Sequence, residues 1–337
     1  MMTVDLRSDT VTKPTPGMLE AMWSAKVGDD VFGEDETINQ LEEKAAAMFG
    51  MEAGIFCPSG TMTNQIAIKC FTQPLDELIA DQTAHVYRYE GGGIAFNSGV
   101  STRLLNGYRG IITPEMIEPE INAENIHYPH TSLVVLENTV NKGGGSCYTL
   151  NDIKPIAELC RARDLKLHLD GARIFNALAH TGDKAVNYGK YFDGISVCLS
   201  KGLGAPVGSV LLADKTTIKY ARRIRKVMGG GMRQAGFLAA AAIYALDHHV
   251  DRLEIDHAHA RILGEELSKL SYVSHVMPVE TNIVLFDTIE PAKAVLAKLA
   301  EKGIKASDTD KHRIRFVTHL DVHADQVEYL VGVLKEL

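Results

Sequence analysis

Two apolar runs, each ending on a polar residue, constrain the fold of this chain more than any other feature. The run LKLHLD ends on Asp170, and the run ISVCLSK ends on Lys201. The interval between them accommodates one crossover between neighbouring parallel strands. Ligands of open α/β sheets bind at the carboxyl ends of such strands. The sequence therefore predicts an α/β fold in which Asp170 and Lys201 lie on adjacent strand ends.

Lys201 itself lies in a turn. Glycine at positions 202, 204 and 208 and proline at 206 exclude a helix or a straight strand there. Burial at a strand end disfavours the charged form of a lysine, which is what a Schiff-base lysine requires. The alternative is an ordinary lysine on a surface loop, and this stretch alone supports both interpretations equally.

A candidate phosphate site opens the helix predicted from Thr61. A short strand at 55–57 is followed by Pro58, Ser59 and Gly60. The unpaired N–H groups and the positive dipole at a helix start favour an anion. Ser59 or Thr61 could equally serve only as the helix N-cap.

Polar side chains also follow another strand. The strand that begins at Leu78 leads into a segment with His85, Tyr89 and Glu90, which indicates a pocket wall or, equally, a surface histidine. A further apolar strand, 132–139, carries Glu137 at its carboxyl end.

Charge and hydropathy exclude several classes of partner. The chain of 337 residues has a formal net charge of −8, which argues against nucleic acid and acidic membranes as main partners. No apolar run approaches the roughly 20 residues of a membrane span, and the polar opening does not resemble a signal peptide. We expect a soluble, cytoplasmic protein.

The cysteine and histidine patterns argue against metal sites. Five cysteines, an odd number without a C-x-x-C pair, predict free and mostly buried thiols of a reducing compartment. No H-x-x-x-H or H-E-x-x-H pair falls on one helix face, so we expect no bound metal. A Ser–His–Asp triad is disfavoured because the G-x-S-x-G elbow is absent.

The length favours one large domain followed by a smaller one. We place the large domain at residues 1–247, including an extended arm at 1–17, and the small α+β domain at 248–337. Apolar strands at 282–286 and 313–319, alternating with helical patterns, predict the second unit.

One cofactor, pyridoxal 5′-phosphate (PLP), matches a phosphate turn, an Asp and a Lys on adjacent strand ends, and a nearby histidine. Its aldehyde forms an imine with lysine, its ring nitrogen stays protonated beside a carboxylate, and its ring stacks on an aromatic or imidazole group. The alternative from another class is a non-catalytic nucleotide-binding or interaction protein.

Seven motifs occur in order between Asp5 and His319: DLRSDTVTKPT, VGDDVFGED, PSGTMTNQ, HLDGARIFNA, CLSKGLGAPVGS, GGGMRQAG and IRFVTHL. Together they resemble the threonine aldolases, fold-type I PLP enzymes of the β-eliminating lyase group. The resemblance implies a large domain with a mostly parallel seven-stranded sheet, a small C-terminal domain, and a homotetramer that shares its active sites. It implies cleavage of L-threonine or L-allo-threonine to glycine and acetaldehyde. The second interpretation is another β-eliminating lyase or an aminotransferase for a small amino acid.

The resemblance also implies residue roles. Lys201 would form the Schiff base and Asp170 would pair with the ring nitrogen. The full set implied for the cofactor is Ser59, Gly60, Thr61, His85, Asp170, Arg173, Lys201 and Arg233, the last from a neighbouring subunit. The set implied for the substrate carboxylate is Ser8, Arg173 and Arg315. The acceptor of the β-hydroxyl proton stays open between His85, His127 and a water held by either and by Glu90.

The two arginines differ in what the residues alone suggest. Arg173 could simply form a salt bridge with Asp170, three residues earlier. Arg315 lies between Ile314 and Phe316 in a strand, so it points to the face opposite to theirs.

Two positions depart from the family pattern. Val140 stands where the family often has histidine, and Phe32 where it often has tyrosine. Both changes concern substrate preference more than reaction type.

Overall fold

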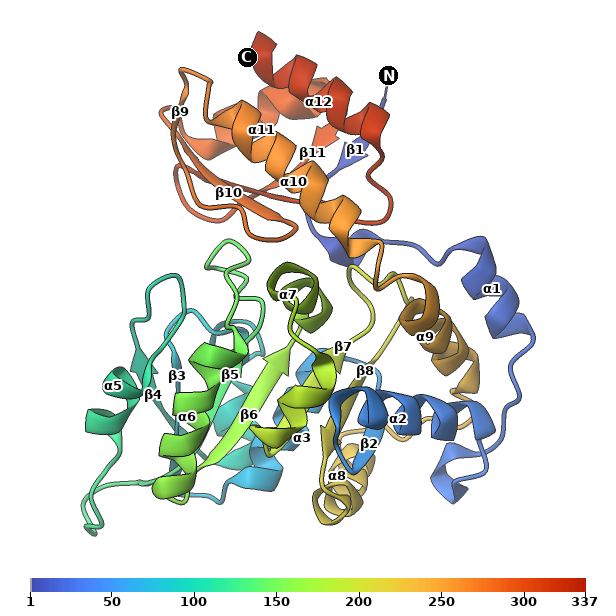
Figure 1. The fold of residues 1–337 in the computed structure, drawn as a ribbon, viewed down its shortest axis with the longest axis vertical. Helices are drawn as coiled ribbons and strands as arrows, with labels where there is room; N and C mark the ends of the chain where they lie inside the picture. The colour runs from blue at the N-terminus through green and yellow to red at the C-terminus, as the bar shows by residue number, and fades with distance from the viewer. Residues whose placement is uncertain (1) are drawn as a thin grey trace.

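A seven-stranded sheet forms the centre of the larger part of the molecule (Figure 1). The computed structural model describes residues 2–337. The strands of this sheet are, in spatial order, β2 (Ala53–Cys57), β8 (Ser209–Ala213), β7 (Gly194–Cys198), β6 (Lys166–Gly171), β5 (His130–Glu137), β3 (Asp76–Asp81) and β4 (Ser101–Leu105). Strand β8 runs antiparallel to the other six strands, which are parallel to one another, so the predicted mostly parallel sheet is confirmed.

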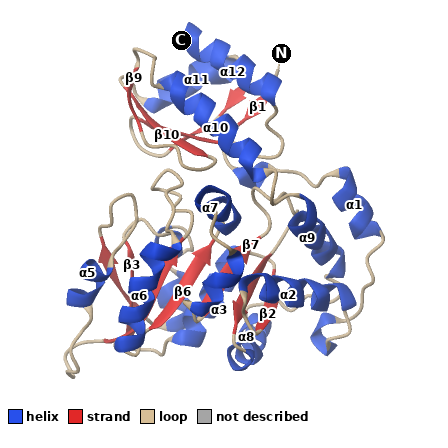
Figure 2. Cartoon of the chain, in the orientation of Figure 1, coloured by secondary structure: helices blue, strands red, loops and turns tan. Residues whose placement is uncertain are grey.

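Helices cover both faces of this sheet because its strands are apolar on both faces. In β2, Phe56 packs into one core cluster, whereas Ile55 and Cys57 pack into another on the opposite face. The first cluster also receives side chains from α2 (Glu36–Phe49), α6 (Leu150–Ala162), α7 (Ile174–Thr181) and α9 (Gly236–His248). The second receives side chains from α3 (Gly60–Phe71) and α8 (Lys215–Val227), and Figure 2 shows the strands enclosed between helices.

A smaller unit carries both ends of the chain (Figure 1). Its antiparallel sheet has the order β12 (Ser307–Asp308), β13 (Arg313–Val317), β10 (Ile283–Thr288) and β9 (Val273–Val276). Its helices are α10 (Leu253–Leu267), α11 (Ala292–Glu301) and α12 (Ala324–Glu336). The first strand of the chain, β1 (Val4–Asp5), pairs in parallel with β11 (Ile304–Lys305). Val4 and Leu6 therefore belong to the core of the small unit, although they begin the chain.

The remaining helices are α1 (Pro16–Trp23), which packs against α9, and the short α4 (His85–Arg88) and α5 (Pro114–Ile117). None of the helices described between residues 2 and 337 has the length and apolar character of a membrane span.

Helix α8 was not identified from the sequence. The basic segment at 222–236 begins inside α8, whose buried side chains Ile218, Ala221 and Ile224 follow the helical period. The many lysines and arginines on the other face of α8 obscure this pattern. The division of the chain between residues 247 and 248 stays a prediction.

Candidate active site

A cavity of about 170 Å³ lies at the carboxyl ends of β6 and β7, beside the start of α3. The residues of interest on its wall are Ser59, Gly60, Thr61, His85, Asp170 and Lys201. We call this space the inner cavity. It brings together the strand ends and the turn that the sequence indicated separately.

The turn at 58–60 forms the start of α3. Ser59 has an extended backbone, and its hydroxyl accepts a hydrogen bond from the N–H of Met62 at 3.2 Å. Ser59 is therefore the N-cap of α3. The N-cap does not exclude anion binding, because the first turn of a helix has more N–H groups than one side chain can satisfy. Gly60 and Thr61 line the cavity beside this cap.

Asp170 is buried at the end of β6, and its two carboxylate oxygens differ. Oδ1 accepts the N–H of Ala172 at 3.1 Å. Oδ2 is buried and has no hydrogen-bond partner among the described residues. A buried carboxylate oxygen without a donor is costly, so its position on a cavity wall indicates that a bound group supplies one.

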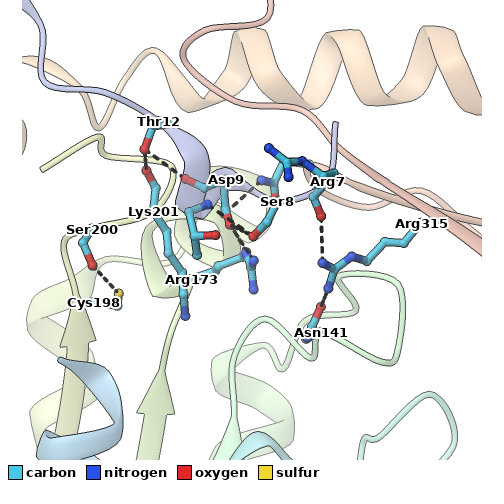
Figure 3. A network of polar contacts seen from close by, with 12 residues as sticks. Arg7, Ser8, Asp9, Thr12, Asn141, Arg173, Cys198, Ser200, Lys201 and Arg315 are labelled. Atoms are coloured by element: carbon cyan, nitrogen blue, oxygen red, sulfur yellow. Dashed lines mark hydrogen bonds and ion pairs between the residues drawn. The ribbon is translucent and has the colours of Figure 1, made fainter. Parts of the chain in front are cut away.

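Lys201 follows β7 in a turn closed by the N–H of Leu199, which donates to the carbonyl of Gly208 at 3.1 Å. Gly208 has φ +115, and a Cβ there would meet the Phe56 ring at 2.3 Å, so only glycine fits. Thr12 donates its hydroxyl to the Lys201 carbonyl at 3.0 Å (Figure 3). These two hydrogen bonds fix the turn, and with it the backbone of Lys201, beside the cavity.

These residues fit PLP. The amine of Lys201 can form an imine with an aldehyde, the lone Oδ2 of Asp170 can accept a protonated ring nitrogen, and the start of α3 can hold a phosphate.

His85 is held on two sides. Its backbone N–H donates to Glu137 Oε2 at 2.8 Å, and its Nδ1 lies 3.0 Å from Glu90 Oε1. Burial by itself would lower the pKa of His85, but the hydrogen bond with Glu90 and the charges of Asp170 and Glu137 outweigh it and raise the pKa. The side chain of Glu90 has no exposed surface, so it supports His85 from behind.

Glu137 lies opposite Asp170 in the sheet register. Burial, together with the charge of Asp170, raises the pKa of Glu137 to about 7 against the opposing hydrogen bonds from the N–H groups of Asn141 and His85. His85, Glu90 and Asp170 also present ligand atoms within 4.8 Å of one another, the spacing of a metal site. They lie on the wall of the inner cavity, where the PLP ring is expected.

A second cavity, of about 330 Å³, adjoins the first and shares His85 and Lys201 with it. Its wall also includes Ser8, Arg173 and Arg315, the three residues implied for the substrate carboxylate. We call this space the outer cavity; Figure 3 shows these side chains around it.

Arg173 forms a buried ion pair with Asp9 rather than with Asp170. Its Nε and one terminal nitrogen donate to the two Asp9 oxygens at 2.7 and 2.6 Å. Burial would raise the pKa of Asp9, but Arg173 and the charge of Lys201 lower it to about 2. Arg173 is therefore positively charged and fixed in orientation.

Arg315 points away from the buried side chains of Ile314 and Phe316, as the strand pattern predicts. Its terminal nitrogens donate to Asn141 Oδ1 at 2.7 Å and to the Arg7 carbonyl at 2.9 Å. Burial and the nearby charge of Arg173 lower its pKa. An anion between the two guanidinium groups would offset both effects, so the outer cavity is suited to a carboxylate.

Ser8 caps the 3₁₀ turn Asp9–Val11, and its hydroxyl accepts the N–H of Thr10 at 3.2 Å. This turn lays the N-terminal arm across the outer cavity.

Two predicted site residues lie outside both cavities. His127 is exposed in the loop before β5, at the amino end of that strand, and its N–H donates to Asn125. Arg233 is exposed and pairs with Asp29 at 2.8 Å. Within one chain, neither is brought to Lys201.

Three residues of the site were not identified as functional from the sequence. Asn64 borders the inner cavity and contacts Glu90, Asn141 orients Arg315, and Glu137 supports His85. Only Glu137 had a signal, as a polar residue at the end of an apolar strand.

The cysteines match the prediction of unpaired thiols, because all five are free. Burial raises the pKa of Cys57, Cys70 and Cys160 to about 12, so these thiols are unreactive at neutral pH.

Comparisons with known proteins agree with this geometry. Residues 5–291 match the family described as beta-eliminating lyase. A probable low-specificity L-threonine aldolase of Arabidopsis thaliana is 41% identical over 344 residues, 99% of this chain and 97% of the relative. A low specificity L-threonine aldolase of Escherichia coli strain K12 is 42% identical over 328 residues, 96% of each chain.

Solved structures show the same fold at low identity. A threonine aldolase of Leishmania major superposes with a TM-score of 0.87 at 21% identity, covering 99% of both chains. A serine palmitoyltransferase of Sphingomonas wittichii reaches 0.76 at 17% identity, covering 99% of this chain and 86% of that one.

Proposed function

Because the chain belongs to the β-eliminating lyase family, among the low-specificity L-threonine aldolases, we propose that it cleaves L-threonine and L-allo-threonine to glycine and acetaldehyde. It is a PLP-dependent lyase. The observation that carries the substrate assignment is the junction of the two cavities, where Lys201 and His85 face a carboxylate site formed by Arg173 and Arg315.

The inner cavity would hold the cofactor. Lys201 would bind its aldehyde carbon, Asp170 its ring nitrogen and the start of α3 its phosphate. When bound, PLP supplies an electron sink for the pair released from the Cα–Cβ bond.

The outer cavity would orient the substrate. Arg173, Arg315 and Ser8 would hold its carboxylate, which leaves the amino group directed towards Lys201 and the side chain directed towards His85. Arg173 is locked by Asp9 and Arg315 by Asn141, so the two guanidinium groups are ordered before the substrate arrives.

His85 is the proton acceptor that the geometry supports best. Its Nδ1 faces Glu90, which leaves Nε2 as the ring atom that can take the β-hydroxyl proton. The Glu90 carboxylate would stabilise the resulting imidazolium. His127 lies outside both cavities of this chain, so it would have to come from another subunit to contribute.

We also propose a homotetramer in which Arg233 reaches the phosphate of a neighbouring subunit. Large apolar side chains that are more than 70% exposed support an assembly, namely Trp23, Phe32, Leu75, Phe96, Tyr108, Ile126 and Val227. Light scattering should give the mass of four chains, and Arg233→Ala should release the cofactor more easily. A fully active monomer would contradict the assembly. The five free thiols support a reducing compartment such as the cytoplasm.

The deciding experiment is a product assay with L-threonine and L-allo-threonine in parallel. We expect acetaldehyde and glycine in equal amounts from both substrates. A keto acid without acetaldehyde would identify an eliminating lyase or an aminotransferase instead. A protein that binds no PLP would exclude all three of these activities.

A further inference from the structure

Three side chains from two of the sequence motifs hold neither the cofactor nor the substrate in the proposed function. They are Asn64 and Gln65, which end the motif PSGTMTNQ, and His168, which begins HLDGARIFNA. All three side chains are buried, and polar side chains are rarely buried without a partner.

These residues meet at Glu90. Asn64 lies in the second turn of α3 and bridges two groups: its amide contacts Glu90 Oε1 at 3.0 Å and His168 Nε2 at 3.1 Å. Gln65 donates to Glu90 Oε2 at 2.7 Å, and His85 Nδ1 lies 3.0 Å from Oε1. The far side of the His168 ring is occupied as well, because Nδ1 lies 3.0 Å from the carbonyl of Gly194.

The bridge constrains the number of protons. If the Asn64 oxygen faces His168, then Nε2 must donate to it while Nδ1 donates to the Gly194 carbonyl, so His168 is an imidazolium. If the Asn64 nitrogen faces His168, a neutral ring suffices, but the Asn64 oxygen then faces Glu90, which must be protonated to donate. Either orientation of the amide requires one proton on one of the two groups.

We propose that Glu90 and His168 carry a single proton between them, and that its location determines whether Glu90 can stabilise a positive charge on His85. With the proton on His168, Glu90 is a carboxylate against the His85 ring. With the proton on Glu90, that support is lost. Asn64 and His168 are thus positioning residues that act on His85 through Glu90.

Burial and the neighbouring carboxylates act on this proton in opposite directions. His168 and Asp170 are two residues apart in β6, so their side chains lie on the same face of the sheet, beneath α3. Glu137 of β5 is another buried carboxylate near His85. Burial lowers the pKa of His168 to about 4, although Asp170 and the Gly194 carbonyl oppose the shift. Burial therefore works against an imidazolium at His168, and the charge of Asp170 works for it.

The test counts the proton directly in the full-length protein, with PLP bound and again after its removal. Nitrogen-15 NMR of labelled histidines distinguishes the imidazolium from the two neutral tautomers of His168. Infrared spectroscopy of carbon-13-labelled glutamate, compared with Glu90→Gln, shows whether Glu90 is protonated. At pH 7 we expect one signal or the other. A neutral His168 with an ionised Glu90, or both groups protonated, would overturn the proposal.

Variants at Asn64 should move the proton count in opposite directions. Asn64→Asp offers an anionic acceptor to both neighbours, so both should be protonated and the His85 titration should shift to lower pH. Asn64→Leu breaks the link and should leave His168 neutral with its proton on Nδ1. Gln65→Leu is the matched control, because it removes a donor from the same carboxylate without touching His168, whose signals should not change.

Only the role of His85 as proton acceptor rests on the proposed function; the shared proton does not. In Asn64→Asp, kcat/KM for threonine should fall by roughly 10-fold or more while PLP is retained. Absence of threonine cleavage by the unmodified protein would refute the proposed function, and the spectroscopic proton count would still stand or fall separately.

Discussion

The inner and outer cavities share His85 and Lys201 but are assembled differently. The residues of the inner cavity come from positions 58–201 and lie on strand ends of one sheet and on the helix beside them. The outer cavity joins Ser8 to Arg315, residues from opposite ends of the chain. Connectivity within one sheet therefore places the cofactor groups, whereas the packing of the arm and the small unit against that sheet places the substrate groups.

The N-terminal arm is the structural link between the two. Within a few residues the Arg7 carbonyl accepts from Arg315, Asp9 pairs with Arg173, and Thr12 donates to the Lys201 carbonyl (Figure 3). Changes in the inner cavity should therefore affect cofactor and chemistry, and changes in the outer cavity should affect substrate binding first.

The largest effect is expected at the residue common to both cavities. Lys201→Ala should reduce acetaldehyde formation by roughly 10³-fold or more. Among the described residues, Lys201 is the one lysine that borders both cavities, so no other amine can replace it. Borohydride should no longer attach PLP to the chain. Lys142→Ala is the control, since Lys142 borders only the outer cavity, over the Tyr89 ring. Retention of near-normal turnover in Lys201→Ala would rule out the Schiff-base assignment.

Asp170→Asn tests the inner cavity alone. The change keeps the shape but removes the charge that faces the ring nitrogen, and loss of one partner of a buried pair costs about 3 kcal/mol, or roughly 150-fold. We expect that loss to appear in kcat and in the rate of PLP release, measured by absorbance. Asp164→Asn, at an exposed carboxylate, should change neither. An effect confined to KM would contradict the assignment of cofactor binding and chemistry to the inner cavity and of substrate binding to the outer cavity.

Arg315→Lys tests the outer cavity alone. A lysine cannot donate to Asn141, to the Arg7 carbonyl and to a substrate carboxylate in the geometry of a guanidinium group. KM for threonine should rise by about 10-fold or more, with PLP retention unchanged. Arg313→Lys on the same strand is the control, because Arg313 pairs with Asp287 and does not border the cavity. Easier loss of PLP from Arg315→Lys would show that the two cavities are not independent.

Asp9→Asn tests the arm that joins them and should act mainly on stability. It leaves Arg173 buried without its anion, so the free energy of unfolding should fall by about 3 kcal/mol at pH 7, measured with urea. The folded-state pKa of Asp9 is lowered to about 2 from 3.8, so this stabilisation is complete above pH 4. The difference between the variant and the unmodified protein should therefore shrink as the pH falls from 4 towards 2.

Asp5→Asn, which alters a more exposed pair with Arg7, should have a much smaller effect on the free energy of unfolding. A pH-independent difference for Asp9→Asn would show that packing, not the ion pair, accounts for the loss.

Much of the fold could be predicted because its signals are local. Apolar strands, the glycine-rich turn after Lys201 and the helix start at Ser59 each follow from a short run of residues. Helix α8 was missed because its charged face dominates its composition. The partner of Arg173 was not predictable, because Asp170 is near in sequence whereas Asp9 is brought near only by the arm.

The sequence by itself determined the pairing of Asp170 with Lys201 at one sheet edge, because strand direction and crossover length leave few arrangements. Only the tertiary structure decided that Glu90 lies behind His85, that Asp9 holds Arg173, and that His127 and Arg233 lie outside the cavities of their own chain. Those placements depend on packing between segments far apart in the chain, and no local pattern encodes which of several possible partners a charged side chain will meet.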